Sequence, residues 1–326
     1  MDYTLCAGLS GIAWGIVHLA KQNLIGIENE SFFSELDNHI YEYALKDIKI
    51  KGNVDILYGG LGAMVYFLER LPNEDARNYL GEIVNELWLS AVVEMDEVKW
   101  INSFNSSYTV NSIGDEYNLG LAHGITGIIA VLCKVYDQQI EQDRCSYLIN
   151  GSINWLLKQK LPETFYSIFP TAVGKDIEVY NSRLGWCYGD LPIAWVLYQA
   201  GISLNRKEWQ QEAIRIMLHA SKRRELEKNE VLDAGICHGT AGIAHLFNRF
   251  YHKTQEPDLK EAANYWINET IKMAKFEDGL AGYKAWHGKK GWNNCTGLLE
   301  GIAGIGIVLI SAINENETPW DACLLM

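Results

Sequence analysis

The stretch CHGTAGIAHLFNRFY, residues 237–251, joins a small turn containing glycine to an apolar segment of helical length. The turn holds Cys237, His238 and Gly239, and the segment after it carries apolar residues on most of its faces. A helix that is apolar nearly all round must be buried on every side, whereas a surface helix needs only one apolar stripe. The stretch therefore predicts a helix inside the molecule, beginning at a turn that bears two potential metal ligands.

The same pattern of glycine turn and apolar helix occurs six times, at intervals of 50 to 65 residues. Recurrence over tens of residues is typical of a repeat architecture. Glycine suits such turns because it tolerates positive φ and lets backbones approach closely. The segments are 7–19, 58–71, 122–136, 187–200, 237–251 and 299–313, with leading glycines Gly8, Gly59, Gly124, Gly189, Gly239 and Gly301.

Amphipathic stretches of helical length separate these segments. Their charged face suits solvent and their apolar face suits a neighbouring helix. The alternation predicts an all-α fold, an α/α toroid in which outer helices wrap an inner ring, as one domain over residues 1–326. The amphipathic stretches include 73–93, 144–159, 208–223 and 258–274.

The repeat also predicts where the turns lie. Because every repeat returns to the same direction, the inner helices run parallel and their glycine turns gather at one end of the ring. An open solenoid of helical hairpins has the same periodicity. We expect a closed ring, because no polar capping repeat is evident. We interpret the segments from about 96 to 118 and 162 to 182 as long loops over the same end.

Composition and charge exclude several classes of protein. The chain has 326 residues, is 48% hydrophobic and 21% charged, and can bury a sizeable core. A net charge of -13 argues against nucleic acid or an anionic membrane as the main partner. No apolar run reaches the roughly 18 residues of a membrane span, and the N-terminus lacks the pattern of a signal peptide. Seven cysteines without a C-x-x-C pair favour reduced thiols in a cytoplasm.

The glycine turns carry polar and reactive side chains, which the packing of apolar helices does not require. Two thiolates and an imidazole are typical ligands of Zn²⁺, and three protein ligands leave a fourth position for water or substrate. Cys187, Cys237 and His238 thus form a candidate catalytic zinc site, although a buried cysteine is often only a small hydrophobe. The set in the turns is Asp55, His123, Arg183, Cys187, Cys237, His238 and Glu300; we interpret Glu300 as structural, along with Cys6, Cys133, Cys145, Cys295 and Cys323.

The chain resembles the lanthionine synthetase C-like family, the cyclases of lanthipeptide biosynthesis. The resemblance covers essentially the whole chain. It implies an α/α toroid with one Zn²⁺ per chain, held by Cys187, Cys237 and His238. It rests on GLAHGITG (120–127), SRLGWCYGD (182–190), GICHGTAG (235–242) and LLEGIAG (298–304), in that order.

The resemblance also implies catalytic roles for three residues. His123 matches the histidine of the family's A-H-G turn, Asp55 its acidic residue, and Arg183 the arginine four positions before the first zinc cysteine. Two alternatives stay open: Asp55 could cap a helix, and Arg183 could pair with Asp190. Trp186 and Tyr188, which flank Cys187, are expected to wall the pocket.

Two features depart from the family pattern. The family commonly has seven inner helices, whereas only six glycine turns are found here, so either the ring is incomplete or its remaining helix lacks the glycine signature. The turn after W-C-Y-G usually ends in Pro-Gly, whereas here Gly189 is followed by Asp190, Leu191 and Pro192. Neither departure removes a residue that carries chemistry.

The activity implied is addition of a peptide's cysteine thiol to a dehydroalanine or dehydrobutyrine of the same peptide, forming a thioether ring. The partners implied are a dehydrated precursor peptide with its leader, a separate dehydratase and, at a membrane, an exporter, all met in a bacterial cytoplasm. Two other functions remain. A family relative could add glutathione or another small thiol, although such relatives tend to read W-C-H-G. A non-catalytic zinc scaffold could bind a modified peptide.

Overall fold

The computed structural model describes residues 2–26, 30–101, 116–175, 177–314 and 319–326, most of them helical. Within these ranges, the inner helices follow the glycine turns. They are α1 (Leu9–Lys21), α3 (Leu61–Arg70), α5 (Ile125–Asp137), α7 (Asp190–Ser203), α9 (Thr240–Thr254) and α11 (Ile302–Ile313). The outer helices are α2 (Glu30–Lys51), α4 (Glu74–Ser90), α6 (Gln142–Leu157), α8 (Lys207–Ala220) and α10 (Pro257–Lys272).

Burial separates the two kinds of helix as the sequence predicts. In α7 every residue from Asp190 to Leu197 is buried, so this part of the helix has no solvent face. In α10 the buried residues recur at helical spacing and form one stripe, which is the pattern of a surface helix. They are Leu259, Ala262, Ala263, Trp266 and Thr270.

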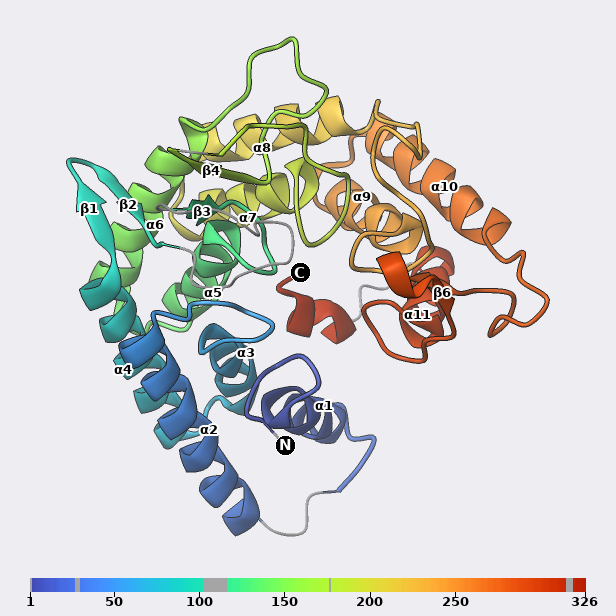
Figure 1. Ribbon diagram of the computed structural model, residues 1–326. Coiled ribbons are helices and arrows are strands. Elements are labelled where there is room, and N and C mark those ends of the chain that lie inside the picture. The colour runs from blue at the N-terminus through green and yellow to red at the C-terminus, as the bar shows by residue number, and fades with distance from the viewer. Residues whose placement is uncertain (1, 27–29, 102–115, 176, 315–318) are drawn as a thin grey trace.

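The inner helices pack in chain order, α1 against α3 and so on to α9 against α11. The outer helices cover them, with α4 against α3, α6 against α5, α8 against α7 and α10 against α9. Figure 1 shows the resulting double layer curving around a central region. The chain is an α/α toroid, as the sequence predicts.

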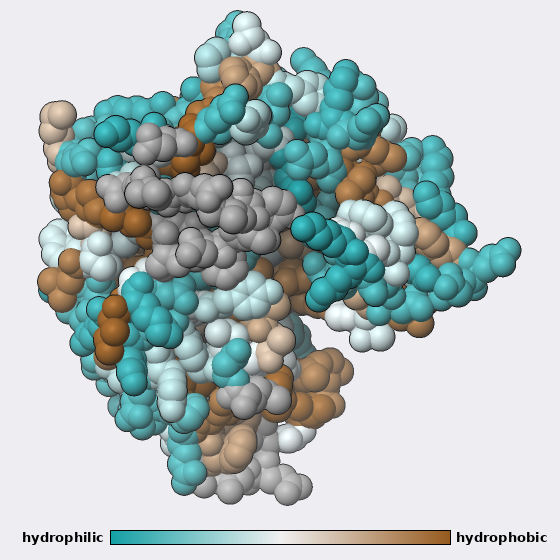
Figure 2. Space-filling model, in the orientation of Figure 1, coloured by the Kyte–Doolittle hydropathy of each residue, from teal (hydrophilic) through white to brown (hydrophobic). Residues whose placement is uncertain are grey.

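Among the described residues the inner ring is incomplete, as the count of six glycine turns allowed. In the described part of the chain, no inner helix lies between α1 and α11 (Figure 1). Ile12 and Ile16 of α1 are therefore 48% and 38% exposed, and Ile310 and Ile313 of α11 are 62% and 86% exposed. The space-filling view is hollowed on this side (Figure 2). Six glycine turns supply six inner helices, and one inner position is open.

A short 3-10 helix, η2 (Pro319–Leu324), lies at the centre of the toroid (Figure 1). The indole Nε1 of Trp186 donates to the carbonyl of Leu324, and that of Trp195 to the carbonyl of Leu325, both at 3.0 Å. Leu324, Leu325 and Met326 are buried. The segment thus fills the middle of the ring and is fixed to α7 and to the turn before it.

The two predicted loops are less irregular than expected. Strand β3 (Glu116–Asn118) in the first pairs with β4 (Ala172–Gly174) in the second. The first loop also begins with β2 (Glu97–Lys99), which pairs with β1 (Val92–Glu94). Its residues 102–115 lie outside the described part. No helix in the described ranges has both the length and the apolar character needed to cross a bilayer.

The glycine turns gather at one end, as predicted, because backbone hydrogen bonds join each turn to the next. These bonds hold the turns in fixed register, so the residues in them share one site. The donors and acceptors are Cys6 N and Leu57 O (2.9 Å), Ile56 N and Ala122 O (3.3 Å), Leu121 N and Cys187 O (2.9 Å), Cys187 N and Cys237 O (3.1 Å), and Cys237 N and Leu299 O (2.9 Å).

Candidate active site

A cavity of about 2140 Å³ lies where the turns meet. Its lining includes five of the six predicted site residues, and the sixth, Asp55, is buried directly behind His123. It also includes five of the seven cysteines: Cys6, Cys187, Cys237, Cys295 and Cys323.

Cys187, Cys237 and His238 come together as predicted. The two cysteine Sγ atoms and one ring nitrogen of the histidine all lie within 4.8 Å of one another. The bond between Cys187 N and Cys237 O brings the two turns together, and His238 follows directly. Two soft thiols and an imidazole are a donor set that suits Zn²⁺, so these residues fit the metal.

The two thiols have opposite pKa shifts. The hydrogen bond from the Cys237 thiol holds the pKa of Cys187 well below its usual range, with help from His238 and Arg183. The same bond, together with burial, raises the pKa of Cys237. Burial alone would lower the pKa of His238, but the Cys187 thiolate raises it. The cluster therefore favours a thiolate at Cys187, and a metal binding there would displace the protons that Cys237 and His238 hold.

His123 and Asp55 form a second part of the site. The Nδ1 atom of His123 lies 2.6 Å from Oδ2 of Asp55. The other carboxylate oxygen of Asp55 accepts from the backbone N of Tyr58 at 2.7 Å, and the Asp55 side chain is 1% exposed. Helix α3 is capped by Gly60, so the alternative role of Asp55 as a helix cap is wrong. A buried carboxylate here orients the imidazole and sets its tautomer.

Arg183 does not form an ion pair with Asp190, so the alternative structural role suggested for Arg183 is wrong. Its Nη2 lies 3.0 Å from Oε2 of Glu230, a glutamate with a 58% exposed side chain. The positive charge of Arg183 helps to lower the pKa of Cys187 and partly opposes the rise in the pKa of Cys237. Arg183 therefore lies close enough to the thiols to act on anionic groups in the cavity.

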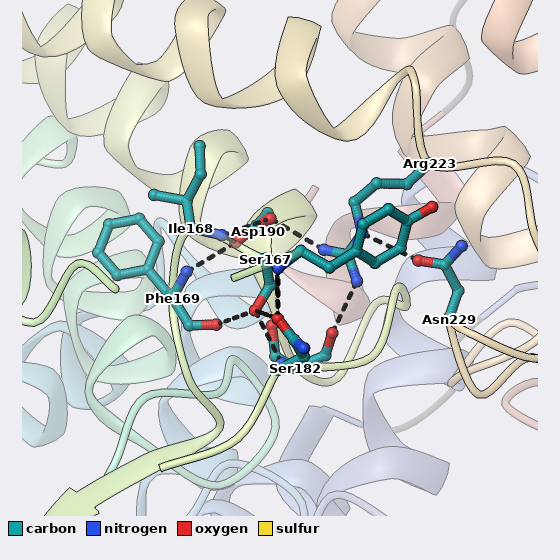
Figure 3. A network of polar contacts seen from close by, with 9 residues as sticks. Ser167, Ile168, Phe169, Ser182, Asp190, Arg223 and Asn229 are labelled. Atoms are coloured by element: carbon teal, nitrogen blue, oxygen red, sulfur yellow. Dashed lines mark hydrogen bonds and ion pairs between the residues drawn. The ribbon is translucent and has the colours of Figure 1, made fainter. Parts of the chain in front are cut away.

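Asp190 pairs instead with Arg223, and both side chains are almost fully buried (Figure 3). The Nη1 of Arg223 lies 2.9 Å from Oδ2 of Asp190, and its Nη2 donates to the carbonyl of Ser182 at 2.7 Å. Asp190 also accepts from the backbone N of Ile168 and Phe169. The pair thus fixes both ends of the segment 182–190, which carries Arg183 and Cys187.

Gly189 gives this segment its exit into α7. Its φ of 92° is one that other residues rarely adopt, and a Cβ here would lie 2.2 Å from the carbonyl oxygen of Arg183. Glycine is therefore required at this position.

The aromatic neighbours of Cys187 differ from each other. Tyr188 lines the cavity as expected, and its ring lies 6.0 Å from that of His123. Trp186 does not line it: the side chain is buried and donates to Leu324.

Sequence reasoning missed some residues of the cavity. Tyr58, in the Y-G-G turn, lies with its ring 6.0 Å from that of His123. Cys295 and Glu300, interpreted as structural, group with His287 at the cavity wall. The occurrence of a histidine and a cysteine just before a glycine turn was the available signal for this group.

Comparisons with known proteins agree with this architecture. The chain is 24% identical to the nisin biosynthesis protein NisC of Lactococcus lactis subsp. lactis, over 99% of this chain and 77% of that protein. It is 28% identical to the glutathione S-transferase LANCL1 of Danio rerio, over 58% of this chain and 41% of that protein.

Solved structures show the same fold. A nisin cyclase superposes with a TM-score of 0.74 at 19% identity, over 100% of this chain and 80% of that one. A cellobiose 2-epimerase from Bacillus thermoamylovorans superposes with a TM-score of 0.54 at 12% identity, over 97% and 86%. The family model described as lanthionine synthetase C-like protein matches residues 1–325. The chain belongs to the lanthionine synthetase C-like family.

Proposed function

We propose that this protein is a lanthipeptide cyclase. It adds a cysteine thiol of a dehydrated peptide to a dehydroalanine or dehydrobutyrine of the same peptide, and so forms a thioether ring. The observation that carries the proposal is that a three-donor metal site opens on the same cavity as a histidine–aspartate pair. Similarity to the nisin biosynthesis protein supports it.

Cys187, Cys237 and His238 would hold one Zn²⁺ per chain. When bound, Zn²⁺ would supply a fourth coordination position that favours the thiolate form of an incoming cysteine. The thiolate is the nucleophilic form, whereas a free thiol with a pKa near 8.5 is mostly protonated at pH 7.

His123 is the proposed proton-transfer residue. Asp55 beside Nδ1 favours the tautomer that keeps a proton on that atom, which leaves Nε2 to exchange protons with the substrate. In the reaction, sulfur bonds to the β-carbon and the electrons of the double bond move toward the α-carbon and its carbonyl. A proton is then added at the α-carbon. His123 takes the thiol proton or supplies the proton to carbon, and Asp55 stabilises the imidazolium.

Arg183 is the proposed stabiliser of the enolate. A guanidinium offers several donors in a fixed fork, so it can bind the enolate oxygen or a peptide carbonyl. Tyr188 walls the pocket beside His123, and its hydroxyl accepts from Asn118 at 3.2 Å.

The cavity is larger than a small thiol requires. Sites for small molecules measure about 300–1,000 Å³, whereas this cavity has about 2140 Å³. The cavity therefore has space for a peptide segment that carries both the thiol and the dehydroamino acid, as the cyclase reaction requires. The peptide would carry a leader and come from a separate dehydratase in the cytoplasm, with an exporter as a further partner.

The experiment compares His123→Ala with His238→Ala on a dehydrated precursor peptide. General acid–base catalysis contributes about 10²–10⁴-fold, so His123→Ala should cyclise slower by that factor, after subtraction of the uncatalysed rate, and keep its zinc. His238→Ala should lose both zinc and activity. Cyclisation leaves the mass unchanged, so a thiol-alkylating probe counts the free cysteines.

The control is His39→Ala, because His39 is an exposed histidine on α2. This variant should match the unmodified protein in cyclisation rate and zinc content. Wild-type cyclisation by His123→Ala, or loss of its zinc, would refute the assigned roles. Efficient addition of glutathione to the same peptide, without ring formation, would favour the small-thiol activity instead.

A further inference from the structure

His287, Cys295 and Glu300 form a second group of metal-ligating side chains, apart from the proposed zinc site. Their three ligand atoms all lie within 4.8 Å of one another. The Nε2 of His287 is 3.1 Å from Oε2 of Glu300 and 3.6 Å from Sγ of Cys295.

Two of the three separations match the edges of a zinc coordination tetrahedron. Bond lengths of about 2.0–2.1 Å to nitrogen and oxygen and about 2.3 Å to sulfur give edges of roughly 3.3 Å and 3.5 Å at a tetrahedral angle. The observed separations of 3.1 Å and 3.6 Å are close to both.

Hydrogen bonding alone satisfies this group poorly. Both Glu300 and Cys295 approach the same atom, Nε2 of His287. An imidazole nitrogen carries one proton or one lone pair, so it can serve only one of the two partners well. A cation placed between the three donors would satisfy all of them.

The backbone fixes each of the three donors. His287 follows β5 (Ala285–Trp286), which pairs with β6 (Trp292–Asn293), and its N donates to the carbonyl of Gly291 at 3.0 Å. The carbonyl of Cys295 accepts from Ile302 N at 3.0 Å, at the start of α11. Glu300 directly precedes Gly301, the cap of that helix. Because the backbone of all three residues is held in place, their side chains need little rearrangement to bind a metal.

The group faces the proposed active site. Cys295 and Glu300 line the large cavity, and Leu299, the neighbour of Glu300, accepts the backbone hydrogen bond of Cys237. We propose that His287, Cys295 and Glu300 bind a second divalent cation, of the Zn²⁺ class, with a fourth position reached from the cavity. A soft ligand such as a peptide thiol is the chemistry that this position would accept. With one thiolate and with His287 and Glu300 partly exposed, the site should bind Zn²⁺ more weakly than the first.

The test is a Zn²⁺ titration of metal-free full-length protein at micromolar free metal. The unmodified protein should bind two Zn²⁺ per chain. Cys187→Ala/Cys237→Ala and His287→Ala/Cys295→Ala should each bind one, and the variant with all four changes none. The control Cys6→Ala/His39→Ala, which removes one cavity cysteine and one exposed histidine, should still bind two.

Co²⁺ gives a second readout that does not depend on the first site surviving mutation. In the otherwise unmodified protein, Cys295→Ala should remove part of the thiolate-to-cobalt absorption, and Cys6→Ala none. A stoichiometry of one in the unmodified protein, with a cobalt spectrum unaffected by Cys295→Ala, would overturn the second site. Because metal binding is scored and not cyclisation, this result would leave the proposed activity standing.

Discussion

The buried pair Asp190–Arg223 should contribute far more to stability than its single ion pair suggests. Asp190 and Arg223 are 0% and 1% exposed, so neither charge can be rehydrated when its partner is removed. In Asp190→Asn the guanidinium keeps its shape but loses the carboxylate, and an amide NH₂ replaces one acceptor. Breaking a buried pair in this way costs about 3–5 kcal/mol, so Asp190→Asn should shift the unfolding equilibrium by roughly 10²–10⁴-fold.

The double variant separates charge from packing. Arg223→Met removes the charge and leaves Asp190 bonded to two backbone N–H groups. Combining Arg223→Met with Asp190→Asn leaves no buried charge, so the double variant should be more stable than the sum of the single losses by about 1–3 kcal/mol. Urea unfolding followed by tryptophan fluorescence gives these free energies.

A control lies on α8, where Glu212 pairs with Arg215 at 2.7 Å and with Lys160 at 2.6 Å, and both pairs are partly exposed. Exposed pairs contribute about 0–1 kcal/mol each, so Glu212→Gln should cost less than Asp190→Asn although it removes two pairs. If Asp190→Asn costs no more than Glu212→Gln, or if the two single losses simply add, the reasoning from burial is refuted.

Two further predictions concern the backbone and pH. Gly189→Ala should destabilise the protein by about 1–3 kcal/mol because its φ is positive, and its zinc content should fall. Gly15→Ala in α1, where a Cβ meets nothing within 4 Å, should be neutral or stabilising; equal effects at both positions, measured by urea unfolding, would contradict this. Burial lowers the pKa of His219 below its ordinary 6.5. The unfolded chain then binds more protons just below pH 6.5, so stability should fall as pH drops from 6.5. His219→Gln should flatten that slope in unfolding curves taken from pH 5 to 7, and an unchanged slope would exclude His219 as the cause.

The helical layers and the gathered turns could be predicted because both follow from local pattern. Helices α5 and α7 are apolar on nearly all faces and are therefore expected inside. Helices α8 and α10 have a single apolar face and are therefore expected outside. With the inner helices parallel, Cys187, Cys237 and His238 had to meet at one end.

What the sequence did not reveal depends on partners far apart in the chain. Arg223 lies beyond an outer helix, and only the fold brings it to Asp190, 33 residues earlier. The pairing of β3 with β4 joins two segments that each look irregular. The sequence raised the open inner position only as one of two alternatives, because six glycine turns fit an incomplete ring as well as a ring whose seventh helix lacks the glycine.

Five cysteines line the cavity, so we ask how such an enzyme would avoid alkylation of its own thiols by the substrate. Dehydroamino acids react with any accessible thiolate, so each of the protein's own thiols competes with the cysteine of the peptide. Burial raises the pKa of Cys323 to about 12, which leaves about one thiolate in 10⁵ at pH 7. Burial also raises the pKa of Cys295, while Cys187 and Cys237 would be occupied as metal ligands. Keeping these four thiols protonated or coordinated would protect a cyclase of this design from alkylating itself at them, while the incoming thiol is activated.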